Sequence, residues 1–561
     1  MTAKDFDTAL ALHQQGKIAE ALEAYLTLLK NDNDNVNLLE LIAVAEAQLA
    51  QYQAAEKHLQ SALKIAPNKP SLLNNLGNLY QQQSLNDKAE AAYLNAIKSD
   101  PSYANAHNNL GKLYFKTAQF NAAEKAFLSA CKHDQDYAEP HFNLALIRCQ
   151  QANNDAAIEL LKKTISINPN HARALGQLGQ LFLIQEQYPE AIENLEKRLK
   201  IQPKHAESWH SLGQAQVQQN LNREAVESFK ECLAINSKHP QAHHDLAVAY
   251  TKLGDHAIAL NHYYQQVEAN PMVESYYNIG VLLMYQERNK EALEYLQHAL
   301  KLQPDNYQAC INMASIYLKK NQTEQASEYY RQALIIEPDN KEIQHILAAI
   351  TQENTPDRAP KEYLSSLFDQ YAFYYDQHLT KCLKYNVPEQ LLAMLKPHCL
   401  ATDAMNIVDL GCGTGLSGAI LQPLAKKLIG IDISNNMILA AKEKNLYDKL
   451  IVGDICEQIK QFNDIDLIIA ADVFTYIGKL DDIIQQCYQA LNNQGFLAFS
   501  VEQSQTDRYK LQASIRYAHS KSYLDAVLTE ANLTIIELNE ATLREQNKKP
   551  VLGYTVLAQR Q

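Results

Sequence analysis

A repeat with a period of about 34 residues runs from the start of this chain to about residue 340. Its clearest marks are Leu76-Gly77, Leu110-Gly111 and Leu178-Gly179. Each glycine is followed twelve residues later by an alanine, and then after four more by a large apolar or aromatic residue. A period of this length is typical of helical hairpins that stack into a solenoid, because one hairpin cannot bury its apolar face alone. We therefore expect this segment to be all-α, with about ten hairpins.

The pattern inside one repeat indicates how its two helices pack. Small residues such as Gly77 and Ala89 are expected where the two helices cross closely. Large residues such as Tyr80 and Tyr93 are expected to fill the gap to the neighbouring helix. Pro101 is expected to end the second helix and the unit.

The repeat resembles the tetratricopeptide repeat. Even the only tryptophan, Trp209, falls where that motif places one, although the unit near Asn270 is a residue short. The resemblance implies a right-handed solenoid that binds a protein or a peptide along its concave surface. Asparagine recurs at the sixth position of several repeats, and its amide offers a donor and an acceptor to an extended peptide. It is also simply common there and solvates the helix; both interpretations stay open for Asn75, Asn109, Asn143, Asn278 and Asn312.

One repeat carries a group of four histidines, His243, His244, His256 and His262. A metal site needs ligands that face one another. The spacing of these histidines places them on different faces of two helices. We therefore expect no metal site.

The repeats end at a proline-containing stretch, 351–360, where we place a domain boundary. The predicted domains are a repeat solenoid with a capping helix (1–352), a linker and aromatic helical lid (353–395) and a second domain (396–561). The lid is dense in aromatic residues at helical spacing. It is either a helix packed on the next domain or a cover over a ligand pocket, and the two are compatible for Phe368, Tyr371, Tyr374 and Tyr375.

Beyond residue 404 the pattern changes to short apolar runs that alternate with helical segments. This alternation predicts an α/β domain with a parallel sheet and crossover helices. Two late runs separated by a polar stretch predict an antiparallel hairpin at the end. The predicted strands are Asn406–Leu410, Leu428–Ile431, Leu450–Val452, Ile465–Ala470, Gly495–Val501, Leu533–Leu538 and Gly553–Ala558.

Acidic residues fall where four successive strands are expected to end, and glycines crowd the first of these ends. In an open α/β sheet, ligands bind beyond the carboxyl ends of the strands. Glycines at this spacing let the backbone turn tightly and approach a ligand. The four acids are Asp409, Asp432, Asp454 and Asp472, and the glycines are Gly411, Gly413 and Gly415.

Glycine spacing alone leaves two cofactors open. Gly413-x-Gly415-x-x-Gly418 also fits the dinucleotide fingerprint, which predicts a nicotinamide-linked dehydrogenase. Two features count against a dinucleotide. Gly411 follows Asp409-Leu410 directly, and the chain ends in a predicted antiparallel hairpin rather than a second mononucleotide-binding half.

The segment Asp409-Leu-Gly-Cys-Gly-Thr-Gly415 is similar to the first motif of class I S-adenosylmethionine-dependent methyltransferases. Further segments look like those of a bacterial family of predicted methyltransferases with N-terminal tetratricopeptide repeats. They are Leu364-x-x-Leu-Phe-Asp-x-Tyr-Ala372 with Tyr375-Asp-x-His-Leu379, Ala470-Ala-Asp-Val-Phe-Thr-Tyr-Ile-Gly478, Phe499-Ser-Val-Glu502 and Arg516-Tyr-Ala-His-Ser520. The resemblance covers nearly the whole chain and implies a Rossmann-like methyltransferase domain after the solenoid.

The resemblance also implies how S-adenosylmethionine is held. The backbone around Gly411, Gly413 and Gly415 would hold its methionine part, with Asp409 near the ammonium group. Asp432, at the end of the next predicted strand, would bind the ribose hydroxyls.

The same resemblance assigns the other end of the cofactor. Asp454 would take the adenine amino group, and the Ile455 N–H would face an adenine ring nitrogen. Ile433 and Met437 would flank the adenine. Two residues after the fourth strand would lie near the reacting methyl group, namely Asp472 and Val473.

Methyl transfer from a sulfonium is an in-line displacement, so the protein mainly aligns the reacting groups. A general base is needed only if the acceptor arrives protonated. Arg516 is a candidate for orienting an anionic acceptor. The candidate bases are Asp472, Tyr476, Glu502 and His519.

Composition narrows the partners and the compartment. The net charge of -13 disfavours nucleic acid and anionic membranes. No apolar run approaches the roughly 18 residues that span a membrane, and no signal peptide is expected. The nine cysteines are scattered, which is typical of reduced thiols in the cytoplasm.

We therefore expect an S-adenosylmethionine-dependent methyltransferase whose repeats recruit the substrate or a partner that carries it. The alternative is an adaptor whose methyltransferase-like domain binds the cofactor but does not catalyse. The stretch Ala471–Tyr476 lacks the Asn/Asp-Pro-Pro-aromatic pattern typical of methylases that act on amides and base amino groups. The pattern does not choose among oxygen, nitrogen, carbon and sulfur acceptors.

Overall fold

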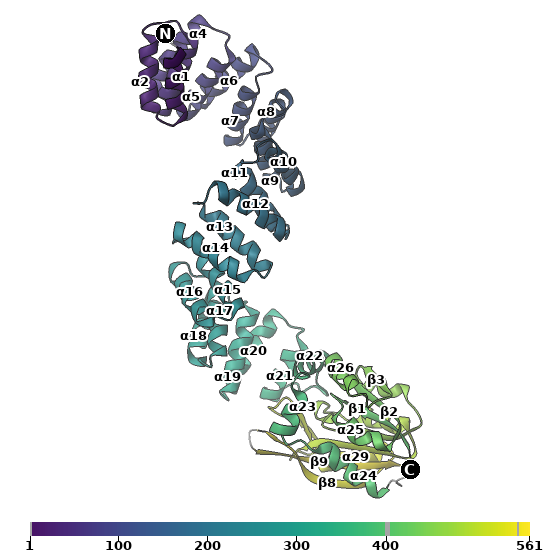
Figure 1. Ribbon diagram of the computed structural model, residues 1–561. Coiled ribbons are helices and arrows are strands. Elements are labelled where there is room, and N and C mark those ends of the chain that lie inside the picture. The colour runs from purple at the N-terminus through teal and green to yellow at the C-terminus, as the bar shows by residue number, and fades with distance from the viewer. Residues whose placement is uncertain (1–2, 399–403, 547–548) are drawn as a thin grey trace. The chain divides into compact units, whose positions relative to one another are not determined.

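The computed structural model describes residues 3–398, 404–546 and 549–561 (Figure 1). The chain forms two compact units, Met1–Ser275 and Tyr276–Gln561, and the division falls inside helix α17 (Val273–Tyr285). The predicted fold class, an all-α repeat solenoid followed by an α/β domain, is confirmed.

Helical hairpins make up the first unit, and each helix is 12 to 14 residues long. The hairpins are α1 (Ala3–Gln14) with α2 (Ile18–Leu29), α3 (Val36–Gln48) with α4 (Tyr52–Ile65), α5 (Pro70–Gln82) with α6 (Asn86–Ser99), α7 (Ala104–Lys116) with α8 (Phe120–His133), α9 (Ala138–Gln150) with α10 (Asn154–Ile167), α11 (Ala172–Ile184) with α12 (Tyr188–Ile201), α13 (Ala206–Gln218) with α14 (Asn222–Ile235), and α15 (Ala242–Leu253) with α16 (His256–Ala269).

The small and large residues of each hairpin pack as the sequence predicts. A Cβ atom at Gly77 would lie 2.5 Å from the ring of Tyr93, and one at Gly111 would lie 2.6 Å from the ring of Phe127. Both rings are buried. The glycine therefore makes room for a large residue sixteen positions later, which lets the two helices cross closely.

A left-handed residue turns the chain between the two helices of each hairpin. Its φ lies between +56° and +60° at the six non-glycine positions of the first unit, and it recurs once in each repeat. The residue type varies widely, so the turn leaves no fixed letter in the sequence. The positions are Gly16, Ala50, Ser84, Ala118, Ala152, Glu186, Asn220 and Gly254.

The second unit begins with more helices of the same kind and then changes character. The hairpins are completed by α17 with α18 (Asn289–Leu302) and by α19 (Tyr307–Lys319) with α20 (Thr323–Ile336), followed by α21 (Lys341–Thr351). The next helices are α22 (Lys361–Tyr371), α23 (Tyr375–Gln377), a π-helical turn (His378–Cys382) and α24 (Val387–Leu395). The predicted domain limits at 352 and 395 stay a prediction.

The sheet of the second unit has the order β3-β2-β1-β4-β5-β7-β6, with β9 also paired to β5 and β8 paired to β9. Neighbouring strands from β3 to β5 are parallel, whereas β9 runs antiparallel to β5 and to β8. The strands are β1 (Met405–Leu410), β2 (Ala425–Asp432), β3 (Lys449–Val452), β4 (Ile465–Ala470), β5 (Leu491–Gln503), β6 (Tyr509–Leu511), β7 (Tyr517–His519), β8 (Leu533–Gln546) and β9 (Lys549–Arg560).

Crossover helices complete this domain, and the sheet has a buried core on each side. One core includes residues of α28 (Asp481–Ala490) and α29 (Lys521–Glu530), and the other includes residues of α24 and α25 (Leu416–Leu421). The helices α26 (Asn435–Glu443) and α27 (Ile455–Gln458) follow β2 and β3, and α22 lies beside α26 (Figure 1).

All seven predicted strands are present, but the final hairpin is longer than predicted. The polar stretch after Leu538 continues β8 to Gln546, and β9 starts at Lys549 rather than at Gly553. Most side chains of this stretch face solvent, so it shows no apolar run, although Leu543 and Arg544 are buried. The short strands β6 and β7 were also not predicted. No helix in the described ranges is both long and apolar enough to cross a membrane.

Candidate functional site

A pocket opens beyond the carboxyl ends of β1 to β4 and has about 750 Å³ of empty volume, including the open space at its mouth. The loops after these strands form one side, and residues 358–375 of the preceding segment form the other. The predicted cofactor residues that line it are Gly411, Gly413, Asp432, Ile433, Met437, Asp454, Ile455, Asp472 and Val473. The structure therefore brings most of them together, while Asp409 and Gly415 lie behind the lining.

The glycine loop after β1 has a backbone that other residues rarely adopt. The φ angles of Gly411, Gly413 and Gly415 are +67°, +53° and +91°. A Cβ atom at Gly411 would collide with the side chain of Val473. Gly415 directly precedes α25, so the loop presents its backbone at the start of a helix.

Asp432 ends β2 and fixes the glycine loop. Its carboxylate accepts the N–H of Gly413 at 2.9 Å and the N–H of Ser434 at 2.9 Å. Burial raises the pKa of Asp432 to about 6, although these backbone hydrogen bonds oppose the rise. The pocket thus contains a buried carboxylate that already orders the loop.

Asp409 lies within β1 and is buried behind the glycine loop. It accepts a 2.7 Å hydrogen bond from the hydroxyl of Tyr447. Burial raises the pKa of Asp409 to about 7, and the nearby Asp432 carboxylate adds to the rise. Tyr447 was not predicted as part of the site, because it sits in an ordinary loop between α26 and β3.

Asp454 follows β3 and caps α27 by accepting the N–H of Cys456 at 2.9 Å. Its other oxygen lies 3.0 Å from both Arg358 and Lys361. Burial acts to raise the pKa of Asp454, but the Lys361 and Arg358 cations and the backbone hydrogen bond hold it below its ordinary value. Two cations from the segment before the sheet thus meet the acid that the resemblance assigns to adenine.

Two more acids tie the predicted lid to the loops after β1 and β2. Asp369 accepts from the hydroxyl of Ser434 at 2.6 Å and from the N–H of Asn436 at 3.1 Å. Asp376 accepts from the hydroxyl of Thr414 and pairs with Lys444 at 2.6 Å. Both acids belong to the motif of the methyltransferase family with tetratricopeptide repeats, but the sequence alone did not indicate what they bind.

The lid aromatics divide into two groups. Phe368 and Tyr375 line the pocket, and Phe368 packs edge-on against Tyr476 with ring centres 5.4 Å apart. Tyr371 and Tyr374 do not line it. The helical segment therefore packs on the domain and lines the pocket, and its role as a lid stays a prediction.

A charged network stands behind the end of β4. Asp472, with an unusual φ of +60°, accepts from Arg516 at 3.1 Å and from Arg544 at 3.0 Å. Glu502 accepts from Arg544 and lies 3.6 Å from Arg516. Two acids and two arginines balance in charge, so no charge in this largely buried network is left unpaired. Arg544 was not predicted, because its strand looked like a polar loop.

The four candidate bases differ in position. Tyr476 lines the pocket, and the Arg516 guanidinium lies over its ring at 5.2 Å. Burial, the largest effect, raises the pKa of Tyr476, while Arg516 opposes the rise. Glu502 does not line the pocket and is held by Arg544.

His519 lies outside the pocket lining, on β7, where its Nε2 contacts the Gly478 carbonyl at 2.9 Å and its ring stacks on Tyr523. Burial lowers the pKa of His519 to about 4. A neutral, buried ring bound to a backbone carbonyl is poorly placed to take a proton from a ligand in the pocket.

The repeated asparagines join neighbouring repeats. The amide of Asn109 donates to Asn74 at 2.9 Å, and that of Asn143 donates to Asn108 at 3.0 Å. Asn75 donates to Glu40 of the preceding repeat in the same way. One N–H of each of these amides is therefore used in a contact between repeats, and the peptide-binding hypothesis stays a prediction.

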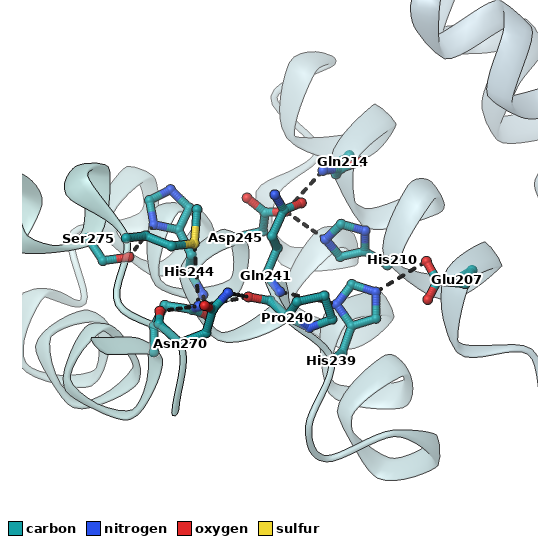
Figure 2. Close-up of polar contacts among 12 residues, drawn as sticks. Glu207, His210, Gln214, His239, Pro240, Gln241, His244, Asp245, Asn270 and Ser275 are labelled. Carbon is teal, nitrogen blue, oxygen red and sulfur yellow. Dashed lines mark hydrogen bonds and ion pairs between the residues drawn. The ribbon is translucent and has the colours of Figure 1, made fainter. Parts of the chain in front are cut away.

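The same ladder position holds Asp245, which accepts from His210 at 2.7 Å and from Gln214 at 3.0 Å (Figure 2). His239 pairs with Glu207 at 3.3 Å close by (Figure 2). A histidine–carboxylate pair here replaces the asparagine pair of earlier repeats. Charged and neutral groups can thus serve the same contact between repeats.

The prediction that the four clustered histidines lie on different faces is wrong for two of them. His243 and His262 have Nδ1 atoms 3.2 Å apart, because α15 and α16 pack with these faces together. His244 instead contacts Ser275 at 2.7 Å (Figure 2). Within the described residues, no group of three metal-ligating side chains is present.

Known families match both parts of the chain. A methyltransferase domain model matches residues 408–499. Tetratricopeptide repeat models match residues 6–70, 86–117, 104–137, 136–204, 206–239 and 283–350.

Curated relatives match the methyltransferase part. The chain is 27% identical over 161 residues to a malonyl-[acyl-carrier protein] O-methyltransferase of Bacillus cereus, covering 28% of this chain and 59% of that protein. It is 33% identical over 101 residues to the ubiquinone biosynthesis O-methyltransferase of Rattus norvegicus, covering 17% and 29%. The chain spans about half the length of the first curated relatives that it matches.

Among solved structures, MamA is 27% identical to this chain, with a TM-score of 0.28, covering 31% of this chain and 94% of MamA. The family models agree with the architecture and with the place of the pocket, which lies partly within the matched methyltransferase segment. The chain is therefore a tetratricopeptide-repeat protein with a methyltransferase domain.

Proposed function

We propose that this chain is a class I S-adenosylmethionine-dependent methyltransferase whose repeats recruit a protein that is, or carries, the methyl acceptor. One observation carries the proposal. The glycine loop and the acids after successive strands converge on a single pocket of about 750 Å³. Ligands of open α/β sheets bind at this edge.

The chemistry of the pocket fits a cationic ligand. Asp409 and Asp432 are buried, and their hydrogen bonds come from a phenol and from backbone N–H groups rather than from cations. Burial raises the pKa of both. A raised pKa means that ionising these buried carboxyls is unfavourable. A ligand that carries a sulfonium and an ammonium group would make their ionisation more favourable, whereas the pyrophosphate of a dinucleotide would make it less favourable. The two carboxylates therefore favour S-adenosylmethionine over NAD.

In this proposal each loop has one part of the cofactor to hold. The backbone at Gly411 and Gly413 takes the methionine part, and Asp432 takes the ribose hydroxyls. Ile433, Met437 and Ile455 pack around the adenine. Asp409 acts from behind the loop, through its charge, rather than by direct contact.

The lid would exclude water once the ligand is bound. Asp369 and Asp376 tie it to two loops, and Arg358 and Lys361 tie it to a third through Asp454. When bound, the cofactor supplies a methyl group on a positively charged sulfur. The residues near Asp472 and Val473 would then align the acceptor for an in-line displacement.

The repeat array supports the recruitment part of the proposal. Tetratricopeptide units offer a long surface for a protein partner, and the names of the curated relatives describe O-methyltransferases. One of those names specifies an acceptor attached to a carrier protein. A protein-borne acceptor would explain why repeats and a methyltransferase domain share one chain.

Calorimetry with S-adenosylhomocysteine tests the cofactor assignment. The full chain should bind one molecule, and Asp432→Ala should weaken binding at least about tenfold through loss of hydrogen bonds to a charged group. Asp482→Ala, an exposed acid on α28, is the matched control and should bind as the parent does. No binding, or equal binding by Asp432→Ala, would contradict the assignment of S-adenosylmethionine as the cofactor. Binding without any methyl transfer to extract would instead favour the adaptor.

A further inference from the structure

One position in the second helix of the hairpins carries an uncharged, buried side chain in all but one of the repeats from α4 to α16. The position recurs every 34 residues, and its residues are Ala62, Ala96, Ala130, Thr164, Arg198, Cys232 and Gln266. All of them except Arg198 are at most 2% exposed. A charged arginine on α12 thus stands where the neighbouring repeats bury an uncharged residue.

The other polar residues at this position have hydrogen-bond partners. Gln266 accepts from the N–H of His244 at 3.1 Å and donates to the carbonyl of Pro240 at 2.8 Å. Thr164 donates to a backbone carbonyl one turn earlier at 2.8 Å. Arg198 makes no ion pair or hydrogen bond with any residue that the structure describes, and its buried Nε has no acceptor. A native polar group in this state calls for an explanation.

A glycine on the first helix of the same hairpin makes room for the arginine. Nη1 of Arg198 lies 1.7 Å from the place that a Cβ atom at Gly176 would occupy. Asn108 and His210 hold the same position as Gly176 in their own repeats, and each of them binds the next repeat. The guanidinium of Arg198 therefore reaches the row of side chains that joins neighbouring repeats, where it has no acceptor.

A second arginine lies near the first. Arg173 precedes Gly176 by one turn of α11, so the two positions share one side of the helix. Arg173 is exposed, and its guanidinium lies over the ring of Phe142 at 4.6 Å. Burial lowers the pKa of Arg198, and the nearby Arg173 cation lowers it further. Both groups stay ionised, because a guanidinium remains charged throughout the physiological pH range.

The acids closest to this arginine pair already have other neighbours. Glu139 and Glu207 hold the position of Arg173 in the repeats before and after it. Glu139 acts on Arg173 only through space and lies 3.2 Å from His171, and Glu207 lies 3.3 Å from His239. A half-buried cation with no counter-ion is unfavourable, so binding of an external anion is favoured here.

We propose that Arg198 and Arg173 form a binding site for the carboxylates of an acidic segment in a partner protein. A planar guanidinium binds a carboxylate through two parallel N–H groups. Two cations match one or two carboxylates, whereas the net charge of -13 opposes a partner with the dense negative charge of a nucleic acid. The inference rests on the recruitment part of the proposed function and names the chemistry of the partner.

Binding of an acidic peptide to the full chain tests the site. The probe is a short fluorescent peptide of alternating glutamate and serine, and the control peptide has glutamine in place of glutamate. Fluorescence anisotropy should show saturable binding of the glutamate peptide, at least about tenfold tighter than that of the glutamine peptide, because hydrogen bonds between charged groups are stronger. Added salt should weaken the binding.

A matched pair of variants assigns the binding to Arg198. Arg198→Met should lower affinity for the glutamate peptide by about tenfold to a hundredfold, because a hydrogen-bonded charge is lost. Arg223→Met removes an exposed arginine on α14, changes the net charge equally and should bind as the parent does. Equal binding by the two variants, or a parent that does not prefer the glutamate peptide, would overturn the site.

Stability distinguishes a ligand site from a structural role. Arg198→Met should unfold in denaturant at a midpoint equal to or higher than that of the parent, because an unpaired cation is replaced by an apolar side chain. A lower midpoint would show that Arg198 serves the fold, and it would overturn the inference.

Three comparisons separate this inference from the cofactor assignment and from a phosphate site. Arg198→Met should bind S-adenosylhomocysteine as the parent does, because Arg198 belongs to the first compact unit. A chain that binds S-adenosylhomocysteine but not the glutamate peptide would overturn this inference alone, and the reverse result would contradict only the cofactor assignment. Inorganic phosphate that binds more tightly than the glutamate peptide would overturn the assignment to protein carboxylates.

Discussion

Residues with a left-handed backbone conformation occur in both the repeats and the methyltransferase domain, but their surroundings differ. In the repeats a left-handed turn recurs in hairpin after hairpin, and glycine, alanine, serine, glutamate and asparagine all occupy it. A Cβ atom at Gly254, one of these turns, would meet nothing within 4 Å. In the pocket, a Cβ atom at Gly411 would collide with Val473. The same φ region therefore occurs in an open turn between repeat helices and in a closely packed loop at the pocket.

Polar groups show the same contrast. In the repeats they pair with the next repeat through one recurring contact, which Asn, Asp and His side chains all serve. Around the pocket each acid has its own partners, drawn from the lid, the backbone or two arginines. We therefore expect substitutions to have small effects on stability in the repeats and large effects on stability or ligand binding at the pocket.

The largest effect is expected for the buried charge network. Arg544→Ala removes one of the two arginines that pair with Asp472 and Glu502 in this largely buried site. Breaking a buried pair in this way costs about 3–5 kcal/mol. Arg288→Ala, which removes an exposed pair with Glu291 on α18, should cost much less, because solvent screens this pair. Denaturant unfolding of both variants measures the difference, and equal losses would contradict the contrast.

The next effect separates the two left-handed glycines. Gly411→Ala should reduce affinity for S-adenosylhomocysteine by roughly a hundredfold or more, since the loop must move away from Val473 and both strain and misplaced contacts add up. Gly254→Ala should leave that affinity unchanged and cost about 1 kcal/mol of stability, because only backbone strain is introduced. Calorimetry measures the change in affinity, and thermal unfolding measures the change in stability. A Gly411→Ala chain that binds normally would show that the loop is as tolerant as the turns.

A pH dependence should follow from the two buried acids. Because the folded pKa of Asp409 is about 7, against 3.8 for an ordinary Asp, the ligand-free fold holds a proton that the unfolded chain has lost. Stability of the ligand-free methyltransferase domain should therefore fall as pH rises from about 4 to 7. Asp409→Asn should flatten this slope in thermal unfolding scans. A slope that stays unchanged in Asp409→Asn would remove Asp409 as its source.

The same acids should make cofactor affinity rise with pH. A cationic ligand favours the ionised carboxylates, so affinity should increase by up to about tenfold per pH unit between pH 5 and pH 7. Titrations in buffers of different ionisation enthalpy would show protons released on binding at about pH 6. Affinity that falls over this range would mean that the charges of the two acids do not favour the bound cation.

The smallest effect concerns the asparagine ladder. Asn143→Ala leaves Asn108 without its amide donor, which should cost about 1 kcal/mol in unfolding. Asn312→Ala removes the corresponding contact with Tyr277 and should cost a similar amount. Loss of a bound peptide with no loss of stability would instead show that the asparagines serve a partner.

The parts of the fold that sequence could predict are those with a period or a dense motif. The repeat frame followed from Gly77, Gly111 and their later partners, because close helix crossing demands small residues at a fixed spacing. The sheet followed from apolar runs that end in acids. The hairpin turns were hidden, because Ala50 and Glu186 adopt the same left-handed conformation as Gly16, so no single residue type marks the turn.

The candidate site divides in the same way. Residues on the loops after the strands were predicted, and most of them line the pocket. The partners that hold them came from distant segments with no motif of their own. Examples are Tyr447, which binds Asp409, and Arg544, which binds Asp472 from a strand with a polar surface. Such contacts arise from three-dimensional packing, so a local sequence pattern does not predict them.

The central claim is that the pocket is built for a cationic methyl donor. Side-by-side calorimetry of the full chain with S-adenosylmethionine and with NAD, at about pH 8 where both buried acids are ionised, tests it most directly. We predict one bound S-adenosylmethionine per chain, weakened at least about tenfold by Asp432→Ala, and no heat of binding with NAD. Binding of NAD in preference to S-adenosylmethionine would contradict the account.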